Sequence, residues 1–348
     1  MKQPEDIRIA QIIDANLDRA REGLRVLEDW ARFGLGREDF VKRFKDFRQI
    51  LGKNHLTNYK QARNSQPDVC EGLSHPEQFK RLTIESIISS NSARVQEALR
   101  VIEEFTRNRH DELASSASKI RYETYQLERV LLLANILRLR KQKLIDNNLY
   151  FITANSNNDN VTEQVQIMLN CGVKIIQYRF KDGNDSENIK VATKLKKLCK
   201  EYDALFIVND RLDIALASDA DGLHLGQEDL KIEHARRLLG PSKIIGLSAN
   251  SETEITKAIR EGSDYLGIGP VFQSTTKKSK SPLGIERVKS LTKKITVPWF
   301  AIGGINSQNI SLLKENNIKK VAIISDLNCK SNSKEKAMII IKTLANEN

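Results

Sequence analysis

Three polar side chains alternate with aromatic ones in the segment QYRFK. They are Gln177, Arg179 and Lys181. If this segment is a β-strand, the three side chains lie on one face of it, because successive side chains of a strand point to opposite sides. An amide and two cations on one face predict a binding site for a charge-dense anion such as a diphosphate.

Acidic side chains follow two other apolar runs. The run ALFIVND ends in Asn209 and Asp210, and the loop sequence GQED contains Asp229. Mg²⁺ binds a small number of hard oxygen ligands, keeps several waters and completes its shell with phosphate oxygens. We therefore predict one magnesium ion held by Asp210 and Asp229. The alternative is that these carboxylates form ion pairs with Arg211 or Lys231.

Hydroxyl and lysine side chains gather in the segment FQSTTKKSKSPLG. Ser274, Thr276 and Lys277 can surround an anion there. A solvated basic loop is the alternative interpretation. The first interpretation adds a further cation, Lys277, to the predicted diphosphate site.

A second anion site is predicted near the C-terminus. Gly304 follows one apolar run, and glycine is needed where the backbone approaches an oxyanion closely. The last run ends at Ile324 and Ser325. A separate run, at 243–249, contributes Ser248. A monophosphate fits this site, with Ser274 and Thr276 contributing. A diphosphate site beside a monophosphate site predicts a transfer in which a diphosphate leaves, neutralised by Mg²⁺ and lysine.

The elements that must position these residues are short apolar or β-branched runs that alternate with amphipathic stretches. This alternation is typical of repeated βα units with parallel strands. Eight such runs follow Asn148, which predicts a closed (β/α)₈ TIM barrel with its active site at the carboxyl ends of the strands. The alternative, an open doubly wound sheet, more often has a glycine-rich turn after its first strand. The runs cover residues 149–153, 173–179, 204–210, 222–226, 243–249, 265–271, 299–305 and 320–326.

The preceding part of the chain has apolar residues at three- and four-residue spacing, which is the periodicity of a helix. We predict an all-α domain over residues 1–130 and the barrel domain over 131–348. The boundary is set near Leu131, to within about 15 residues. It falls in a helix that either ends the first domain or closes the underside of the barrel.

An internal repeat occurs in the helical part. The sequence NLDRAREGLRVLEDWAR at 16–32 recurs as NSARVQEALRVIEEFTR at 91–107, which indicates duplication. On a structural interpretation, Glu22 and Arg25 are i,i+3 partners and the two copies pack as pseudo-symmetric helices. On a functional interpretation, polar residues of both copies line a shared cleft for an anionic ligand. These residues are Asn16, Arg19, Asn91 and Arg94.

Composition argues against several classes of protein. The net charge of +11 is spread without a basic block, so we expect no nucleic-acid partner. The four cysteines show no Cys-x-x-Cys spacing, which predicts neither a zinc site nor disulfides and fits a cytoplasmic enzyme. The N-terminal residues lack the apolar region of a signal peptide, and no run reaches the roughly 18 apolar residues that cross a bilayer, so we expect no membrane partner.

Six ordered motifs closely resemble those of thiamine-phosphate synthase, also called thiamine-phosphate pyrophosphorylase. They are QYRFK, VNDRLDIAL, ADGLHLGQEDL, GLSANS, YLGIGPVFQSTTKK and AIGGI. The resemblance implies that 4-amino-2-methyl-5-pyrimidinylmethyl diphosphate and thiazole phosphate are joined to give thiamine phosphate and diphosphate. It further implies that the carbon–oxygen bond breaks first and that the thiazole nitrogen captures a pyrimidinylmethyl cation. Such a reaction needs no nucleophilic side chain.

The resemblance also assigns roles to single residues. It implies that Asp210 and Asp229 hold one Mg²⁺ and that Arg179, Lys181 and Lys277 are catalytic. The pyrimidine diphosphate is assigned to Gln177, Arg179, Lys181, Asn209, Ser248 and Lys277. The thiazole phosphate is assigned to Ser274, Thr276, Gly304, Ile324 and Ser325. His224 matches the family pattern GxHxGQ, but we expect a packed, hydrogen-bonded core histidine without a catalytic role, and Asp326 stands where a small residue is more usual.

Two alternatives remain open. The barrel could be a phosphate-binding isomerase or synthase of another pathway, which would need a catalytic acid–base pair at the strand ends. The helical part is similar to a family linked to phosphorylation of the pyrimidine precursor, yet it contains no P-loop or other nucleotide fingerprint. It is otherwise a dimerisation or regulatory module, and a homo-oligomer is then expected.

Overall fold

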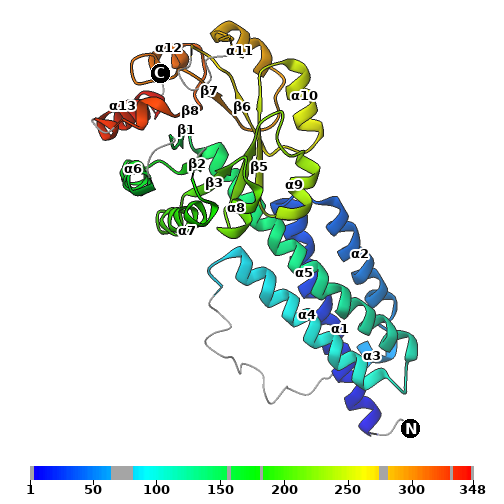
Figure 1. The fold of residues 1–348 in the computed structure, drawn as a ribbon. Coiled ribbons are helices and arrows are strands. Elements are labelled where there is room, and N and C mark those ends of the chain that lie inside the picture. The colour runs from blue at the N-terminus through cyan, green and yellow to red at the C-terminus, as the bar shows by residue number, and fades with distance from the viewer. Residues whose placement is uncertain are drawn as a thin grey trace. The chain divides into compact units, whose positions relative to one another are not determined.

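The computed structural model describes residues 4–63, 81–154, 158–180, 183–273, 281–329 and 332–345. The chain divides into two compact units, Met1–Ile136 and Leu137–Asn348 (Figure 1). None of the described helices combines the length and the hydropathy that a membrane crossing requires.

The first unit is helical, as predicted from its periodicity. It contains α1 (Pro4–Asp29), the π-helical turn η1 (Trp30–Gly34), α2 (Glu38–Lys53), α3 (Thr57–Gln61), α4 (Ile84–Thr106) and most of α5 (Asp111–Asp146). Its core is formed by apolar side chains at helical spacing, among them Leu17 and Leu24 of α1 and Leu99 of α4, all fully buried. The amphipathic pattern of each helix is therefore what holds this unit together.

The two copies of the internal repeat lie mostly on α1 and α4, which pack against each other (Figure 1). Matching positions make matching ion pairs. Glu28 of α1 pairs with Arg48 of α2 at 2.7 Å, and Glu103 of α4 pairs with Arg121 of α5 at 3.0 Å. The repeat therefore places each glutamate opposite an arginine of the helix that follows it.

The asparagines of the repeat have a structural role. Asn16 and Asn91 are buried, and their side-chain amides donate to the carbonyl oxygens of Ile12 (2.8 Å) and Ile87 (2.9 Å) on their own helices. The arginines of the same set, Arg19 and Arg94, are exposed. These positions favour the structural interpretation of the repeat over a shared anion cleft.

The predicted pairing of Glu22 with Arg25 is wrong. Arg25 contacts Asp29 at 3.0 Å and Glu28 at 3.8 Å, toward the C-terminal end of the helix. The physical reason is that Glu28 is fully buried and its charge needs cations around it.

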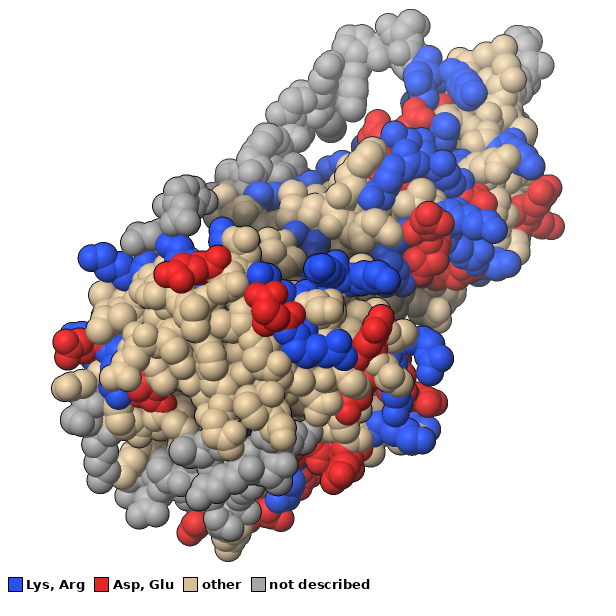
Figure 2. All heavy atoms as spheres, turned by 90° about the horizontal axis from the view of Figure 1, so that it is seen from above, with Lys and Arg blue, Asp and Glu red and all other residues tan. Residues whose placement is uncertain are grey.

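On the face shown in Figure 2, basic and acidic side chains are interspersed.

The second unit is a closed barrel of eight parallel strands, which confirms the predicted fold. The strands are β1 (Leu149–Ile152), β2 (Ile175–Tyr178), β3 (Leu205–Asn209), β4 (Gly222–Leu225), β5 (Ile244–Ala249), β6 (Tyr265–Ile268), β7 (Trp299–Ile302) and β8 (Val321–Ile323). The helices are α6 (Asn158–Asn170), α7 (Asp185–Glu201), α8 (Leu212–Ala217), α9 (Ile232–Leu239), α10 (Glu252–Arg260), α11 (Ile285–Thr292), α12 (Ile310–Glu315) and α13 (Ser333–Ala345), with the short turn η3 (Ser325–Leu327) after β8.

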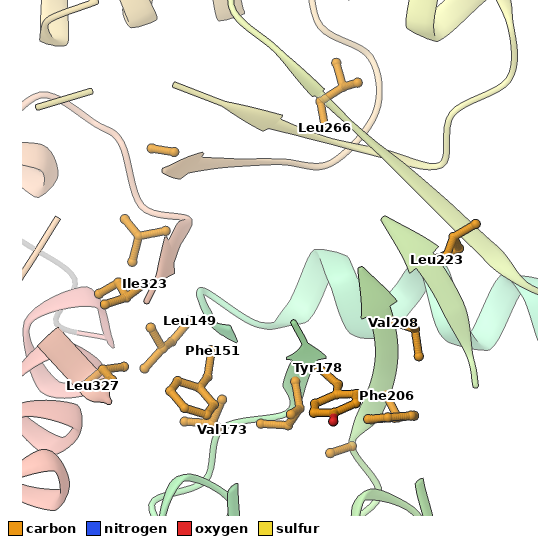
Figure 3. Close-up of a cluster of buried hydrophobic side chains, with 14 of the residues drawn as sticks. Leu149, Phe151, Val173, Tyr178, Phe206, Val208, Leu223, Leu266, Ile323 and Leu327 are labelled. Carbon is orange, nitrogen blue, oxygen red and sulfur yellow. The ribbon is translucent and has the colours of Figure 1, made fainter. Parts of the chain in front are cut away.

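Side chains alternate between two apolar layers along each strand. Those that point outward pack against the helices, as Figure 3 shows for Phe151, Tyr178 and Phe206. Those that point inward form a separate core, to which Tyr150 and Tyr265 belong. This alternation, which follows from the geometry of a strand, decides which residues face the barrel interior.

The last turns of α5 close the underside of the barrel. Leu144 is fully buried in the inner core, and the Lys320 ammonium donates to the Leu144 carbonyl oxygen at 3.1 Å. Arg140 donates to the Asp221 carboxylate at 2.8 Å, and the other carboxylate oxygen accepts the Phe206 N–H of β3. The last turns of α5 therefore pack against the amino-terminal ends of the strands, opposite the end at which the active site of such a barrel lies.

Candidate active site

A cavity of about 430 Å³ opens at the carboxyl ends of the strands. Its wall contains residues that the sequence analysis assigned to both substrates. They are Arg179, Ser248, Gly304, Ile324 and Ser325. These residues come from β5 and from the positions that follow β2, β7 and β8, so closure of the barrel brings together positions that are far apart in the sequence.

Glycine is required in the loop after β7. Gly304 has φ +68°, a conformation that side chains rarely adopt. A Cβ atom there would lie 2.5 Å from the Gln273 carbonyl oxygen. Glycine is therefore needed at this position because the loop after β7 packs closely against the loop after β6, at Phe272 and Gln273.

A chain of hydrogen bonds runs through the barrel interior to the cavity. The Gln177 amide donates to the Tyr150 hydroxyl at 2.7 Å, and this hydroxyl lies 2.9 Å from that of Tyr265. His224 links Tyr265 to Ser248, because its Nδ1 is 3.0 Å from the Tyr265 hydroxyl and its Nε2 is 3.0 Å from the Ser248 hydroxyl. Each member has an inward position on its strand, and Ser248 is the member that lines the cavity.

Burial keeps the two tyrosines of this hydrogen-bond chain protonated. Loss of solvation raises the pKa of both Tyr150 and Tyr265 well above the ordinary value, so both hydroxyls remain protonated at neutral pH. Gln177 is only 1% exposed and lies outside the cavity lining. The prediction that His224 is a packed, hydrogen-bonded core residue is confirmed.

The two predicted metal ligands lie at the carboxyl ends of neighbouring strands. Asp210 follows β3, is exposed and has φ +60°, and its N–H donates to the His224 carbonyl oxygen at 2.8 Å. Asp229 follows β4, is exposed and accepts the Gly226 N–H at 2.6 Å through Oδ2. Among the described residues, no group of three or more His, Cys, Asp or Glu side chains forms a metal cluster. Neither Asp210 nor Asp229 is among the residues that line the cavity, so the metal site they were predicted to form stays a prediction.

Arg211, one of the two cations in the ion-pair alternative, contacts two other carboxylates. Arg211 donates to Asp213 at 2.9 Å and contacts Asp185 at 2.8 Å. These two carboxylates raise the pKa of Arg211, with Asp213 contributing most.

The structure does not describe every predicted site residue. Asn209 is half-buried at the end of β3, next to His224 of β4 in the sheet register. The others that were predicted lie outside the described ranges: Lys181, Ser274, Thr276 and Lys277.

Sequence reasoning missed several residues of the cavity wall. Gln227, which donates to the Ser248 carbonyl oxygen, lies in the GQED loop and could have been found from that motif. Asn250 and Glu254 follow β5, and their position after the carboxyl end of a strand could have marked them as candidate site residues. Lys336 lies on α13, distant in sequence from any strand end, and no pattern marked it.

Two protein families match this chain. The family described as "Thiamine monophosphate synthase" matches residues 149–327, and the "ThiD2 family" matches residues 11–130. The thiamine-phosphate synthase of Prochlorococcus marinus (strain AS9601) is 60% identical, and the match covers 100% of this chain and 98% of that protein. The chain belongs to the thiamine-phosphate synthase family.

Other relatives agree with this membership. The thiamine-phosphate synthase of Prochlorococcus marinus subsp. pastoris is 62% identical over 99% of this chain and 98% of its own length. A solved structure, the thiamine phosphate pyrophosphorylase from Pyrococcus furiosus, has 35% identity and a TM-score of 0.52, and it covers 59% of this chain and 97% of its own. The activity of the chain is that of a thiamine-phosphate synthase, a transferase of thiamine biosynthesis.

Proposed function

We propose that the cavity at the carboxyl ends of the strands is where the two phosphorylated heterocycles are joined. The observation that carries the proposal is that Arg179, Ser248 and Gly304 line one cavity although they come from the end of β2, from β5 and from the loop after β7. A diphosphate would bind at the β2 side, and a monophosphate at the β7 and β8 side. The two substrates would then lie side by side with their reacting atoms in contact.

Three cations would bind and activate the pyrimidine diphosphate. Arg179 offers a planar fork of donors at the rim, and we assign Lys181 and Lys277 to the same diphosphate. The carbon–oxygen bond breaks and its electron pair leaves with the diphosphate, which produces a pyrimidinylmethyl cation. The cations stabilise the departing group because its negative charge grows in the transition state. The thiazole nitrogen then donates its lone pair to the cation and forms the new carbon–nitrogen bond.

Asn209, Gln177 and Ser248 complete the pyrimidine side of the proposal. Ser248 contacts the substrate directly from the cavity wall, and its hydroxyl is oriented by His224. Gln177 is buried beneath the cavity and would act through Tyr150. We also assign Asn209, which ends β3 beside the metal ligand Asp210.

We assign one magnesium ion to Asp210 and Asp229. Both residues supply oxygen ligands only, which suits Mg²⁺ better than a softer metal. The Gly226 N–H donates to Asp229 Oδ2 and so orients that carboxylate, and its other oxygen, Oδ1, would bind the metal. When bound, the metal would neutralise charge on the departing diphosphate.

The thiazole phosphate would bind to backbone and hydroxyl groups. Gly304, Ile324 and Ser325 line the cavity at this end. Ser274 and Thr276 would add hydroxyl donors. N–H groups after the last strands of such barrels commonly bind phosphate.

The decisive experiment mixes the purified full chain with both phosphorylated heterocycles and Mg²⁺ and measures thiamine phosphate by chromatography. Formation of thiamine phosphate and an equal amount of diphosphate is expected, and chelation of the metal should abolish both. Absence of product with metal present would refute the proposal. A sugar phosphate offered as the sole substrate tests the alternative isomerase.

We propose that the helical unit assists supply of the pyrimidine substrate or assembly of the enzyme. The match of residues 11–130 to the ThiD2 family supports a link with the same pathway. A variant that begins at Leu131 separates the two roles. Retained synthase turnover with a loss of oligomer mass would favour assembly into a homo-oligomer, whereas loss of a pyrimidine kinase activity would favour catalysis.

We propose that this enzyme works in the cytoplasm, without nucleic-acid or membrane partners. Three cysteines in the described part of the chain are free thiols: Cys171, Cys199 and Cys329. Burial raises the pKa of Cys199 to about 12, so this thiol is unreactive at neutral pH. Free thiols suit a reducing compartment.

A further inference from the structure

An ion pair in the cavity wall is used by none of the assignments above. Asp326 of η3 and Lys336 of α13 both line the cavity, and the Lys336 ammonium lies 2.8 Å from Asp326 Oδ1. Asp326 Oδ2 accepts the Ser307 N–H at 2.7 Å. The pair therefore connects the loop after β7, the end of β8 and the last helix.

The carboxylate of this pair lies at the end of the cavity proposed for the phosphate. Asp326 follows Ser325 directly and shares the cavity wall with Gly304 and Ile324. Burial alone would raise the pKa of Asp326, but hydrogen bonds from Lys336 and Ser307 lower it below the ordinary value. Asp326 is therefore negatively charged at neutral pH. Its charge would repel a phosphate unless a cation lay beside both.

Lys336 is a cation that could lie beside both the Asp326 carboxylate and a bound phosphate. Of the three N–H donors of an ammonium group, the described part of the chain engages two, through Asp326 Oδ1 and through Cys329 Sγ at 3.5 Å. We propose that the third donor of Lys336 binds the phosphate group of the thiazole substrate and that Asp326 holds the ammonium in position. This inference rests on the proposed function and adds a residue that selects the phosphorylated thiazole over the free alcohol.

The test compares two ligands on the full chain by calorimetry, without the pyrimidine substrate. Thiazole phosphate is expected to bind Lys336→Met about tenfold more weakly than the wild type, or weaker still, which is the usual effect of losing a hydrogen bond to a charged group. Binding of the unphosphorylated thiazole alcohol should not change. Lys342→Met, an exposed lysine of the same helix, is the matched control and should bind both ligands as the wild type does.

A second variant separates contact with the phosphate from mere support of Asp326. In Asp326→Asn/Lys336→Met, the unpaired carboxylate is gone, so affinity for thiazole phosphate should recover only in part. Full recovery would overturn the proposal, as would a change of twofold or less in Lys336→Met. The Lys336 side chain is 32% exposed, so the variants should fold, and Lys336→Gln provides a second replacement if Lys336→Met does not. Failure of the wild type to bind thiazole phosphate would instead refute the proposed function.

Discussion

Replacing Tyr265 by phenylalanine removes a single buried oxygen from the hydrogen-bond chain that ends at Ser248. The Tyr265 hydroxyl lies 2.9 Å from the Tyr150 hydroxyl and 3.0 Å from His224 Nδ1. The ring itself should keep its place, because it fills the space above Gly246, where a Cβ atom would lie 2.1 Å from Tyr265 Cζ. The variant therefore tests the chain of hydrogen bonds and not the packing.

We expect Tyr265→Phe to lower both the free energy of unfolding and kcat. Loss of a buried hydrogen bond, with a partner left unsatisfied, costs about 1–3 kcal/mol of unfolding free energy. If His224 no longer orients the Ser248 hydroxyl, one hydrogen bond to the diphosphate is weakened, and a loss of about 1.4 kcal/mol in the transition state lowers kcat about tenfold. Urea unfolding measures the first part, and steady-state kinetics at saturating thiazole phosphate measures the second.

Tyr178→Phe is the matched control. It also removes a buried tyrosine hydroxyl, which donates to Asn188 at 3.0 Å, but it does so on the outward face of β2. Both variants should lose similar unfolding free energy, and only Tyr265→Phe should lose turnover. Equal kcat values for the two variants would show that the chain of hydrogen bonds through Tyr265 does not position Ser248.

Three further perturbations test other parts of the structure. Asp210→Ala should lower turnover at least about 100-fold, by loss of transition-state stabilisation of some 3 kcal/mol, and should make the remaining activity insensitive to Mg²⁺ in a titration; unchanged metal dependence would exclude its role. Leu144→Ala should cost about 2–5 kcal/mol of unfolding free energy, because the side chain is fully buried in the inner core; a loss below 1 kcal/mol by denaturation would mean that α5 does not close the barrel. Burial alone would raise the pKa of Asp221, but Lys196 and Arg140 lower it below 3.8, so its contribution to stability is present above that pH and is lost as the pH falls through the folded value. In Asp221→Asn, unfolding should be easier at neutral pH by about 3 kcal/mol and less pH-dependent in acid; an unchanged acid profile would argue against this ion-pair network.

The sequence determined the barrel and the inward face of its strands. Gln177 and Arg179 alternate with Tyr178 and Phe180, and this period of two is a local property of an extended chain. Position at the end of a strand was enough to find Ser248 and Ser325, since the carboxyl ends of parallel strands meet at one rim. These inferences needed only the order of residues along each element.

Contacts between distant elements were decided by the tertiary structure alone. Tyr265 meets His224 and Tyr150 because the strands close into a barrel and their register brings these side chains to one height. Lys336 reaches the cavity because α13 packs beside η3 at the end of β8. The periodicity of the sequence predicts which way a side chain points from its own helix or strand. Which residue that side chain contacts depends on how the helices and strands pack together, and this is determined by the packing of the whole core.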